Sequence, residues 1–213
     1  MKKHIGLFLT FFILYHFSAN AQPFTFVSTN IETSGREVQW GDFDNDGDLD
    51  LLISSYPISE YSSVPEGPAL IYRNDGNNKF TNIKAPLDSS YHVEWIDVNN
   101  DNYLDVFLSD AKAVYLNLNG TFQKVSLPIS NSIISYCWGD YDRDGDNDLL
   151  LSIVNTQYLI IFKNTSGQFQ RITTNIPNLK NSRICFEDYD GDGYPDIFFA
   201  GYSSNKTLVS EIF

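Results

Sequence analysis

Short apolar runs alternate with polar turns along most of the chain, and none extends far enough with helical spacing to predict a helix. Runs at 49–56, 104–108 and 149–154 contain leucine, isoleucine, valine and aromatic residues, and clusters of Asp, Asn or Gly flank them. Apolar runs of this length between turn residues are typical of β-strands. The pattern therefore predicts an all-β protein.

The runs belong to a unit that occurs four times. Each copy begins with a phenylalanine strand, continues with a strand that has an aromatic residue two positions before an acidic turn, and ends with two further strands. The copies occupy 24–79, 80–121, 122–168 and 169–213, and their acidic turns begin 55, 43 and 48 residues apart. This period is typical of β-propeller blades with four antiparallel strands. We expect about four such blades.

The acidic turns have the sequences DFDNDGDLD at 42–50, DVNNDNYLD at 97–105, DYDRDGDND at 140–148 and DYDGDGYPD at 188–196. Crowded carboxylates repel one another unless a cation joins them, and calcium prefers six to eight oxygen ligands. We expect side chains at positions 1, 3, 5 and 9 and the carbonyl at position 7 to bind up to four structural calcium ions. The candidate ligands are Asp42, Asp44, Asp46, Asp48, Asp50, Asp97, Asn99, Asp101, Tyr103, Asp105, Asp140, Asp142, Asp144, Asp146, Asp148, Asp188, Asp190, Asp192, Tyr194 and Asp196.

The second loop departs from the pattern. Asn99 replaces an aspartate at position 3, and Asn102 replaces the glycine of position 6. Asn tolerates the left-handed conformation better than most residues, so we expect the turn to survive and its site to be the weakest. An EF-hand would place a Glu at position 12 between helices, but Ile53 and its counterparts are apolar and the flanks favour strands. Solvated acidic turns without metal are the remaining alternative.

The N-terminus indicates export. A positive start at Lys2 and Lys3 precedes an apolar run over 5–17 and an A-x-A sequence at 19–21. This is the pattern of a secretory signal peptide, so we expect residues 1–21 to be removed and the mature protein, 22–213, to be secreted or held at the cell surface. The run is too short to predict a transmembrane segment.

The net charge of -13 argues against nucleic acid as a partner. The acidic loops contain 17 of the 27 acidic residues, so most of this charge has a predicted role as metal ligand. After signal removal His92 is the only histidine, and no nucleophile elbow, zinc motif or phosphate-binding loop is present. His92 is expected to be an ordinary strand residue.

The loops with their flanks, WGDFDNDGDLDLL, WGDYDRDGDNDLL and FEDYDGDGYPDIFF, resemble the FG-GAP or VCBS repeats of calcium-binding β-propellers. These repeats are similar to the propeller at the N-terminus of integrin α subunits. The resemblance covers nearly all of 24–213 and implies that each loop joins the first two strands of a blade, where calcium has a structural role. Such propellers usually have more blades than four, which implies a partial propeller here.

We expect a non-catalytic module for binding or adhesion to a protein or glycan. The alternative is a propeller portion, catalytic or not, of a polysaccharide lyase or hydrolase. Glu94 and Glu187 lie outside the loops but show no spacing that marks a glycosidase pair. The tryptophans at equivalent strand positions are expected to pack between blades instead of stacking on sugars. They are Trp40, Trp95 and Trp138.

Two further expectations concern pairing. Cys137 and Cys185 occupy equivalent positions in their units, and equivalent strands usually lie too far apart for a disulfide, so we expect small apolar fillers. Residues 24–31 match a fourth strand, whereas 207–213 match a third. A four-blade ring closed by these segments, an eight-blade ring of two chains, and a portion of a longer chain with further blades are all consistent with this count. We favour the last, which predicts an open arc.

Overall fold

The computed structural model describes residues 25–55 and 67–213, and these residues contain β-strands and no helix. The all-β prediction is confirmed. The strands are β1 (Val38–Gly41), β2 (Asp50–Ile53), β3 (Leu70–Asn74), β4 (Phe80–Asn82), β5 (Val93–Ile96), β6 (Asp105–Leu108), β7 (Ala113–Leu118), β8 (Thr121–Ser126), β9 (Ile133–Gly139), β10 (Asp148–Ile153), β11 (Tyr158–Thr165), β12 (Gln168–Pro177), β13 (Lys180–Glu187), β14 (Asp196–Tyr202) and β15 (Leu208–Ile212). None of the described segments is a helix that would cross a membrane. The predicted signal peptide lies outside the described residues, and so does most of 57–68, a segment rich in Ser, Pro and Glu between the second and third strands of the first unit.

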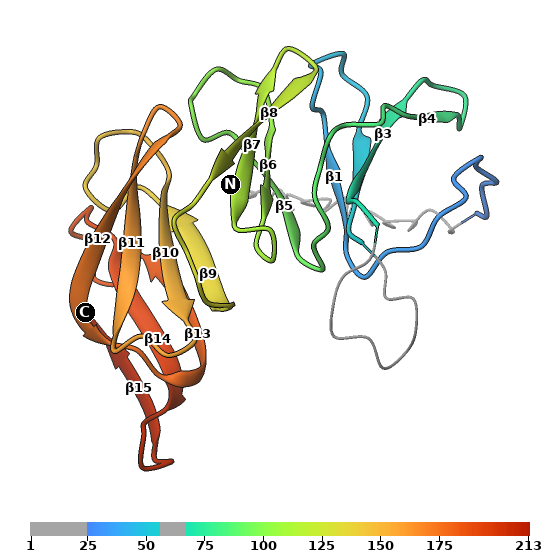
Figure 1. The fold of residues 1–213 in the computed structure, drawn as a ribbon. Helices are drawn as coiled ribbons and strands as arrows, with labels where there is room; N and C mark the ends of the chain where they lie inside the picture. Colours follow the sequence, from blue (N-terminus) through green and yellow to red (C-terminus); the bar gives the residue numbers. More distant parts are fainter. Residues whose placement is uncertain (1–24, 56–66) are drawn as a thin grey trace, which may run out of the picture.

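The strands form four antiparallel sheets arranged as propeller blades. Their orders are β1-β2-β3-β4, β5-β6-β7-β8, β9-β10-β11-β12 and β13-β14-β15. Figure 1 shows the sheets following one another in sequence order along an arc, with β1–β4 and β13–β15 at its ends. Each four-stranded sheet takes its last strand from the start of the next sequence unit, because β4, β8 and β12 begin at or beside the repeated phenylalanine.

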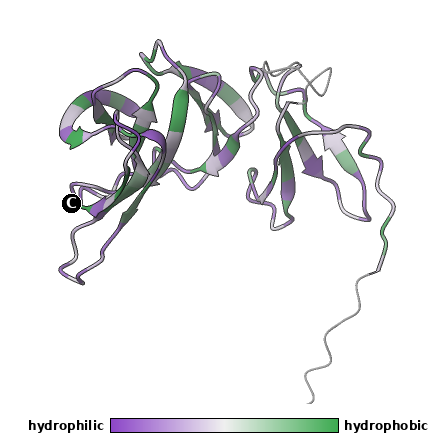
Figure 2. Cartoon of the chain, turned by 90° about the horizontal axis from the view of Figure 1, so that it is seen from below, coloured by the Kyte–Doolittle hydropathy of each residue, from purple (hydrophilic) through white to green (hydrophobic). Residues whose placement is uncertain are grey.

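The core lies between neighbouring sheets. In β10, Leu149 and Leu151 pack toward β5–β8, whereas Leu150 packs toward β13–β15. Because side chains alternate across a strand, a strand buried on both faces must be apolar at consecutive positions. This explains the unbroken run of buried residues in β2, β6 and β10. Figure 2 shows the hydrophobic colouring concentrated on the strands of the stacked sheets.

A glycine ends the first strand at two of the sheet junctions. A Cβ atom on Gly41 would lie 2.7 Å from the Trp95 ring, and one on Gly139 would lie 2.8 Å from the Phe186 ring. The aromatic residue before the second, third and fourth acidic loops therefore packs against the preceding blade, as predicted for Trp95 and Trp138. Trp40 differs, because it belongs to the first described sheet and is 58% exposed. The packing prediction is wrong for Trp40.

The segment before β1 is not the expected strand. Residues 25–31 have no strand pairing, and instead the Asn30 side chain bonds both main-chain groups of Phe80 at 2.8 Å. Within the described residues no backbone hydrogen bond joins 25–31 to β15. A four-blade ring closed by these two segments is therefore not formed. Completion by a second chain or by further blades stays a prediction.

Cys137 in β9 and Cys185 in β13 are both unpaired. Cys137 packs at the edge of the cluster between the last two sheets, which fits the expected role as a small apolar filler. Cys185 is exposed and does not fit that role.

Candidate functional site

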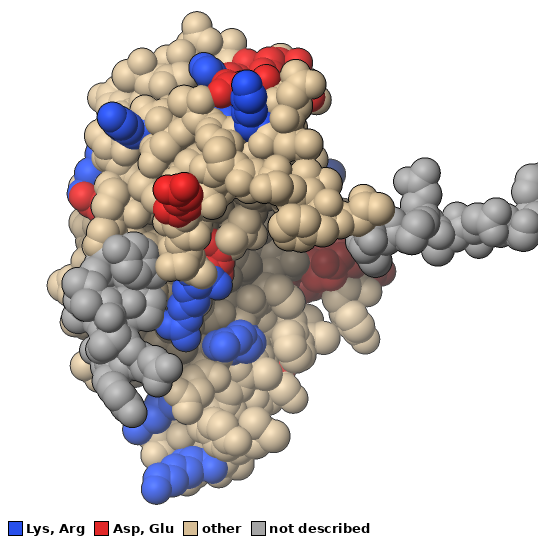
Figure 3. Space-filling view, turned by 90° about the vertical axis from the view of Figure 1, so that its right-hand side faces the viewer, with Lys and Arg blue, Asp and Glu red and all other residues tan. Residues whose placement is uncertain are grey.

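Each acidic loop connects the first two strands of a sheet. The four connections run from β1 to β2, from β5 to β6, from β9 to β10 and from β13 to β14. The turn between the third and fourth strands lies at the same end of the sheet, because Asn74 N donates to Asp50 Oδ1 at 2.8 Å. Figure 3 faces the β1–β4 end of the arc and shows carboxylates gathered at its upper edge beside cationic side chains.

Three loops bring the carboxylates of positions 1, 3 and 9 together. In each group one oxygen of every carboxylate lies within 4.8 Å of the others. The groups are Asp42, Asp44 and Asp50; Asp140, Asp142 and Asp148; and Asp188, Asp190 and Asp196. These nine residues belong to the predicted set of ligands. The second loop does not form such a group of carboxylates.

The position 5 carboxylates turn toward the loop backbone. Asp46 Oδ1 accepts from Asp48 N at 2.9 Å, and the same bond recurs in the other loops with Asp101, Asp144 and Asp192 as acceptors. The position 1 carboxylates also accept from main-chain N–H groups, as when Asp42 accepts from Asp46 N at 3.1 Å and Gly47 N at 3.0 Å. These carboxylates therefore fix the shape of the loop in addition to supplying oxygen atoms.

Position 9 is the buried anchor of the first three loops. Asp50, Asp105 and Asp148 have no exposed surface, and each accepts two main-chain hydrogen bonds. Burial raises the pKa of each of these three carboxyls to about 6, although the hydrogen bonds act in the opposite direction. A cation beside them would favour the ionised form.

The second loop keeps this framework with different side chains. Asn102 has φ 68°, which is the left-handed conformation predicted for it. Its N–H donates to Asp97 Oδ2 at 3.0 Å. At position 3, Asn99 Nδ2 donates to Asp101 Oδ2 at 2.9 Å. The Asn99 amide thus supplies a hydrogen-bond donor to the position 5 carboxylate of its own loop.

Sequence analysis missed the asparagines that lock the loops together. Asn117 and Asn164 are fully buried, and their Nδ2 groups donate to Phe43 O at 2.8 Å and to Val98 O at 2.6 Å in the loop of the preceding sheet. Each also donates to the carbonyl at position 8 of its own loop and accepts from a turn glycine. Each precedes a glycine by three residues, but this spacing does not show a contact between sheets.

Position 4 forms a second contact between loops. Asn45 Nδ2 donates to Asn102 O at 2.9 Å, and Asn100 Nδ2 donates to Gly145 O at 3.0 Å and to Asp146 Oδ1 at 2.7 Å. Arg143 continues the series, with its guanidinium 4.6 Å from the Tyr194 ring centre. The four loops therefore form one continuous row.

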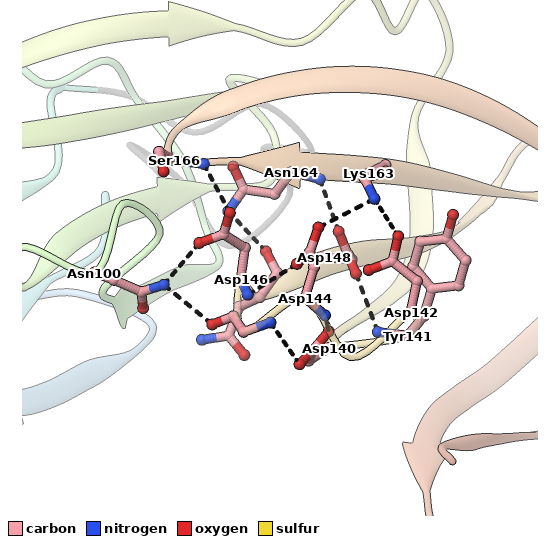
Figure 4. Close-up of polar contacts among 12 residues, drawn as sticks. Asn100, Asp140, Tyr141, Asp142, Asp144, Asp146, Asp148, Lys163, Asn164 and Ser166 are labelled. Atoms are coloured by element: carbon pink, nitrogen blue, oxygen red, sulfur yellow. Dashed lines mark hydrogen bonds and ion pairs between the residues drawn. The ribbon is translucent and has the colours of Figure 1, made fainter.

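A lysine enters the third loop from β11. Lys163 Nζ contacts Asp142 Oδ2 and lies 3.0 Å from Asp144 Oδ2, as Figure 4 shows. Hydrogen bonds to Asp142 and then Asp144 raise the pKa of Lys163. A main-chain bond from Asp146, followed by the lysine contact, lowers the pKa of Asp144. The first loop has no corresponding contact from Arg73, which pairs with Asp75 at 2.8 Å.

The residues of the first loop fit a hard divalent cation. All of their candidate donor atoms are oxygens, which are the ligands that calcium prefers. Asp44 Oδ1 is buried and, among the described residues, has no hydrogen-bond partner; Asp97 Oδ1 in the second loop is in the same situation. A buried polar atom without a hydrogen-bond partner costs free energy of folding, and a cation bound in each of the two loops would give these oxygens a partner. Asp42, Asp44 and Asp50 would hold the ion, which would neutralise their charges.

Two other features lie away from the loops. A pocket of about 670 Å³ opens between the last two sheets, lined by segments that include Thr156, Asn178 and Tyr202. His92 directly precedes β5 instead of lying within a strand as expected, and its Nδ1 lies 2.7 Å from Glu37 Oε1. In β5, burial raises the pKa of Glu94, which hydrogen-bonds Tyr136. The exposed His92 thus has a carboxylate partner.

The stacked sheets and their acidic first turns define a β-propeller built from repeats. Residues 97–151 and 140–199 each match the FG-GAP-like repeat, so the region 97–199 belongs to that repeat family. The predicted resemblance is confirmed.

One solved structure adds a likeness of fold. The crystal structure of BBS1N in complex with ARL6DN, soaked with lead, is 15% identical with a TM-score of 0.52, and the match covers 87% of this chain and 58% of that chain. The chain thus spans less than two thirds of that protein. The Tc holotoxin pore of Photorhabdus luminescens, carrying TccC3-D651A, is 19% identical with a TM-score of 0.43, over 82% of this chain and 11% of that one. No curated protein gave a significant match.

Proposed function

We propose that this protein is an exported, calcium-stabilised propeller module that binds a protein or glycan ligand. The observation that carries the calcium role is the convergence of three carboxylates within 4.8 Å in three loops. The partnerless, buried Asp44 Oδ1 supports it independently. Export rests on the signal-peptide pattern of residues 1–21, and protein sequencing of the secreted form should begin at Gln22.

Calcium would act on the connection between the first two strands of each blade. Position 1 follows the first strand and position 9 begins the second, so an ion held by both ties the ends of the hairpin together. Its two positive charges would offset the repulsion among the carboxylates. Because the folded loop binds the ion and the unfolded chain does not preform it, binding adds stability.

The ligand would use a surface that the loops hold in place. The pocket between the last two sheets combines amides, hydroxyl groups and the Tyr202 ring, and its lining residues include no carboxylate. It lies at the strand connections opposite the acidic loops, for example between β10 and β11. A pocket of this size suits a small ligand or a segment of a larger one.

Thermal unfolding of residues 22–213 in millimolar calcium and in excess EDTA tests the metal role. We expect a higher melting temperature in calcium, with a smaller difference in Asp42→Asn/Asp44→Asn. Glu32→Gln, an exposed acidic change outside the loops, is the matched control and should keep the full difference. Equal melting of the parent protein in both solutions would contradict calcium stabilisation.

Glu94 in β5 hydrogen-bonds Tyr136 in β9, and the pKa of Glu94 is raised. A carboxyl with a raised pKa beside a phenol is suited to proton transfer, so this pair favours a polysaccharide lyase or hydrolase as the second candidate function. Glycan arrays and pull-downs, with and without calcium, test binding. Assays for new reducing ends and unsaturated products test turnover on the same glycans. Turnover that disappears in Glu94→Gln would replace the binding module with an enzyme.

A further inference from the structure

The first and third acidic loops have the same carboxylates at all odd positions, yet their cationic neighbours differ. Arg73 and Lys163 occupy equivalent places, each directly before the asparagine that donates to the position 9 aspartate. Lys163 contacts Asp142 and Asp144, whereas Arg73 binds Asp75 outside the loop. In the second blade the equivalent residue, directly before Asn117, is the uncharged Leu116.

The sequence explains the different directions of the two side chains. Asp75 follows Asn74 and places a carboxylate beside Arg73. The Nε and Nη2 atoms of Arg73 both lie 2.8 Å from Asp75 Oδ1. The equivalent residue in the third blade, Thr165, is neutral, so the nearest carboxylates for Lys163 are those of the loop. The Lys163 side chain is 28% exposed, compared with 44% for Arg73. Partial burial strengthens the lysine contact relative to a fully solvated pair.

We propose that Lys163 is a built-in cation of the third loop, which calcium must displace, so that this loop binds calcium more weakly than the first. Asp142 is one of the three converging carboxylates, and Figure 4 shows the lysine on the same group of oxygens. An ion bound there with Lys163 in place would face a like charge at close range. The lysine also offsets the negative charge of Asp142 and Asp144 in the absence of calcium. The carboxylates of the calcium-free third loop therefore repel one another less than those of the calcium-free first loop.

This inference rests on the proposed calcium role and deepens it. It ranks two loops that their sequences alone would make equal, and it assigns the difference to one residue of β11. It also predicts a two-stage response, in which the first loop fills at lower calcium concentration than the third. In the first stage calcium binds the first loop and stabilises the first blade. In the second stage calcium displaces Lys163 from the third loop.

Calcium titration calorimetry on residues 22–213 tests the proposal. Asp140→Asn identifies the heat of the third loop by removing it. In Lys163→Met, that heat should move to about tenfold tighter binding, equivalent to about 1.4 kcal/mol. The same variant should melt at a lower temperature in EDTA, because the empty loop loses its cation. Lys180→Met, at the opposite end of the sheets, should change neither quantity.

Thr165→Asp provides a second route that leaves the lysine in place. The new carboxylate should draw Lys163 away, as Asp75 does for Arg73, and tighten the third loop in the same direction. Unchanged third-loop affinity in both Lys163→Met and Thr165→Asp overturns the lysine proposal alone. Absence of any calcium heat in the parent protein overturns the proposed calcium role and the lysine proposal together.

Discussion

The second and third acidic loops share a framework but differ in their ligands. In both, a buried position 9 aspartate accepts two main-chain bonds, and a buried asparagine ties the loop to the preceding sheet. At position 3, however, the second loop has Asn99 and the third has Asp142. The comparison separates the residues that form the turn from those that would bind an ion. A loop that loses a ligand can therefore keep its fold.

The largest expected effect concerns the shared framework. Asn117→Ala and Asn164→Ala each leave buried main-chain groups without partners, so each should lower the free energy of unfolding by about 2–4 kcal/mol. Asn74→Ala is the control: its side chain bonds Leu49 O and Gly76 N only within its own sheet, and the loss should be about 1 kcal/mol. Urea unfolding measures all three.

The losses at Asn117 and Asn164 should be similar to each other and should persist in EDTA, because they do not require a metal. A loss at Asn164 that appears only in calcium would show that the framework depends on the ion. In that case the second and third loops would not share an independent framework.

A second effect is the pH dependence of the anchors. Asp50, Asp105 and Asp148 have a folded pKa of about 6, above the ordinary 3.8, so the fold binds their protons more tightly than the unfolded chain does. Their stabilising contribution is complete below about pH 4 and is lost as the pH rises through about 6. In EDTA, the melting temperature should therefore fall between pH 5 and pH 7.

Calcium should reduce this fall, since the ion replaces the proton as the partner of each carboxylate. Asp105→Asn and Asp148→Asn should each remove a similar part of the fall in EDTA, because both anchors accept two main-chain hydrogen bonds and have a pKa of about 6. Carboxyls with a lowered pKa, such as Asp75 and Asp88, titrate below 3.8 and do not contribute in this range. A melting temperature that rises from pH 5 to pH 7 in EDTA would contradict the assignment.

The sequence was sufficient for the repeating part of the molecule. Alternating strands, the unit period and the aspartates of the loops predicted the sheets and the three converging groups, and Asn102 was expected to adopt its left-handed conformation. These features depend on residues close together in the chain. Local geometry decides them, and local sequence therefore predicts them.

The sequence was insufficient where distant segments meet. The contact of Lys163 joins β11 to Asp142, with a sequence separation of 21, and the bond from Asn117 to Phe43 O joins two sheets. Trp40 is followed by Gly-Asp, as Trp138 is, but Trp40 is exposed because no sheet precedes it among the described residues. Each outcome follows from the stacking of blades, which local patterns do not contain.

A third effect converts the second loop toward the third. Asn99→Asp replaces the amide that donates to Asp101 Oδ2 with a carboxylate at position 3. We expect lower stability in EDTA by roughly 0.5–1 kcal/mol and about tenfold tighter calcium binding at this loop. Asn155→Asp, an exposed change away from the loops, is the control. Calorimetry that finds no gain in calcium affinity would show that position 3 does not limit the second site.

The smallest effect concerns the contact between these two loops. Asn100 holds Gly145 O and Asp146 Oδ1, and the Asp146 carbonyl is a predicted ligand of the third site. Asn100→Gly suits the φ of 57° and removes only the side chain, so stability in EDTA should change by less than about 0.5 kcal/mol. Calcium binding at the third loop should weaken about two- to threefold, because the position 7 peptide is held less firmly. Asn45→Gly is the matched control, since Asn45 contacts Asn102 O and should affect the second loop instead. If both variants change calcium binding at the same loop in calorimetry, these contacts do not act only on the loop that each one touches, and the prediction is wrong.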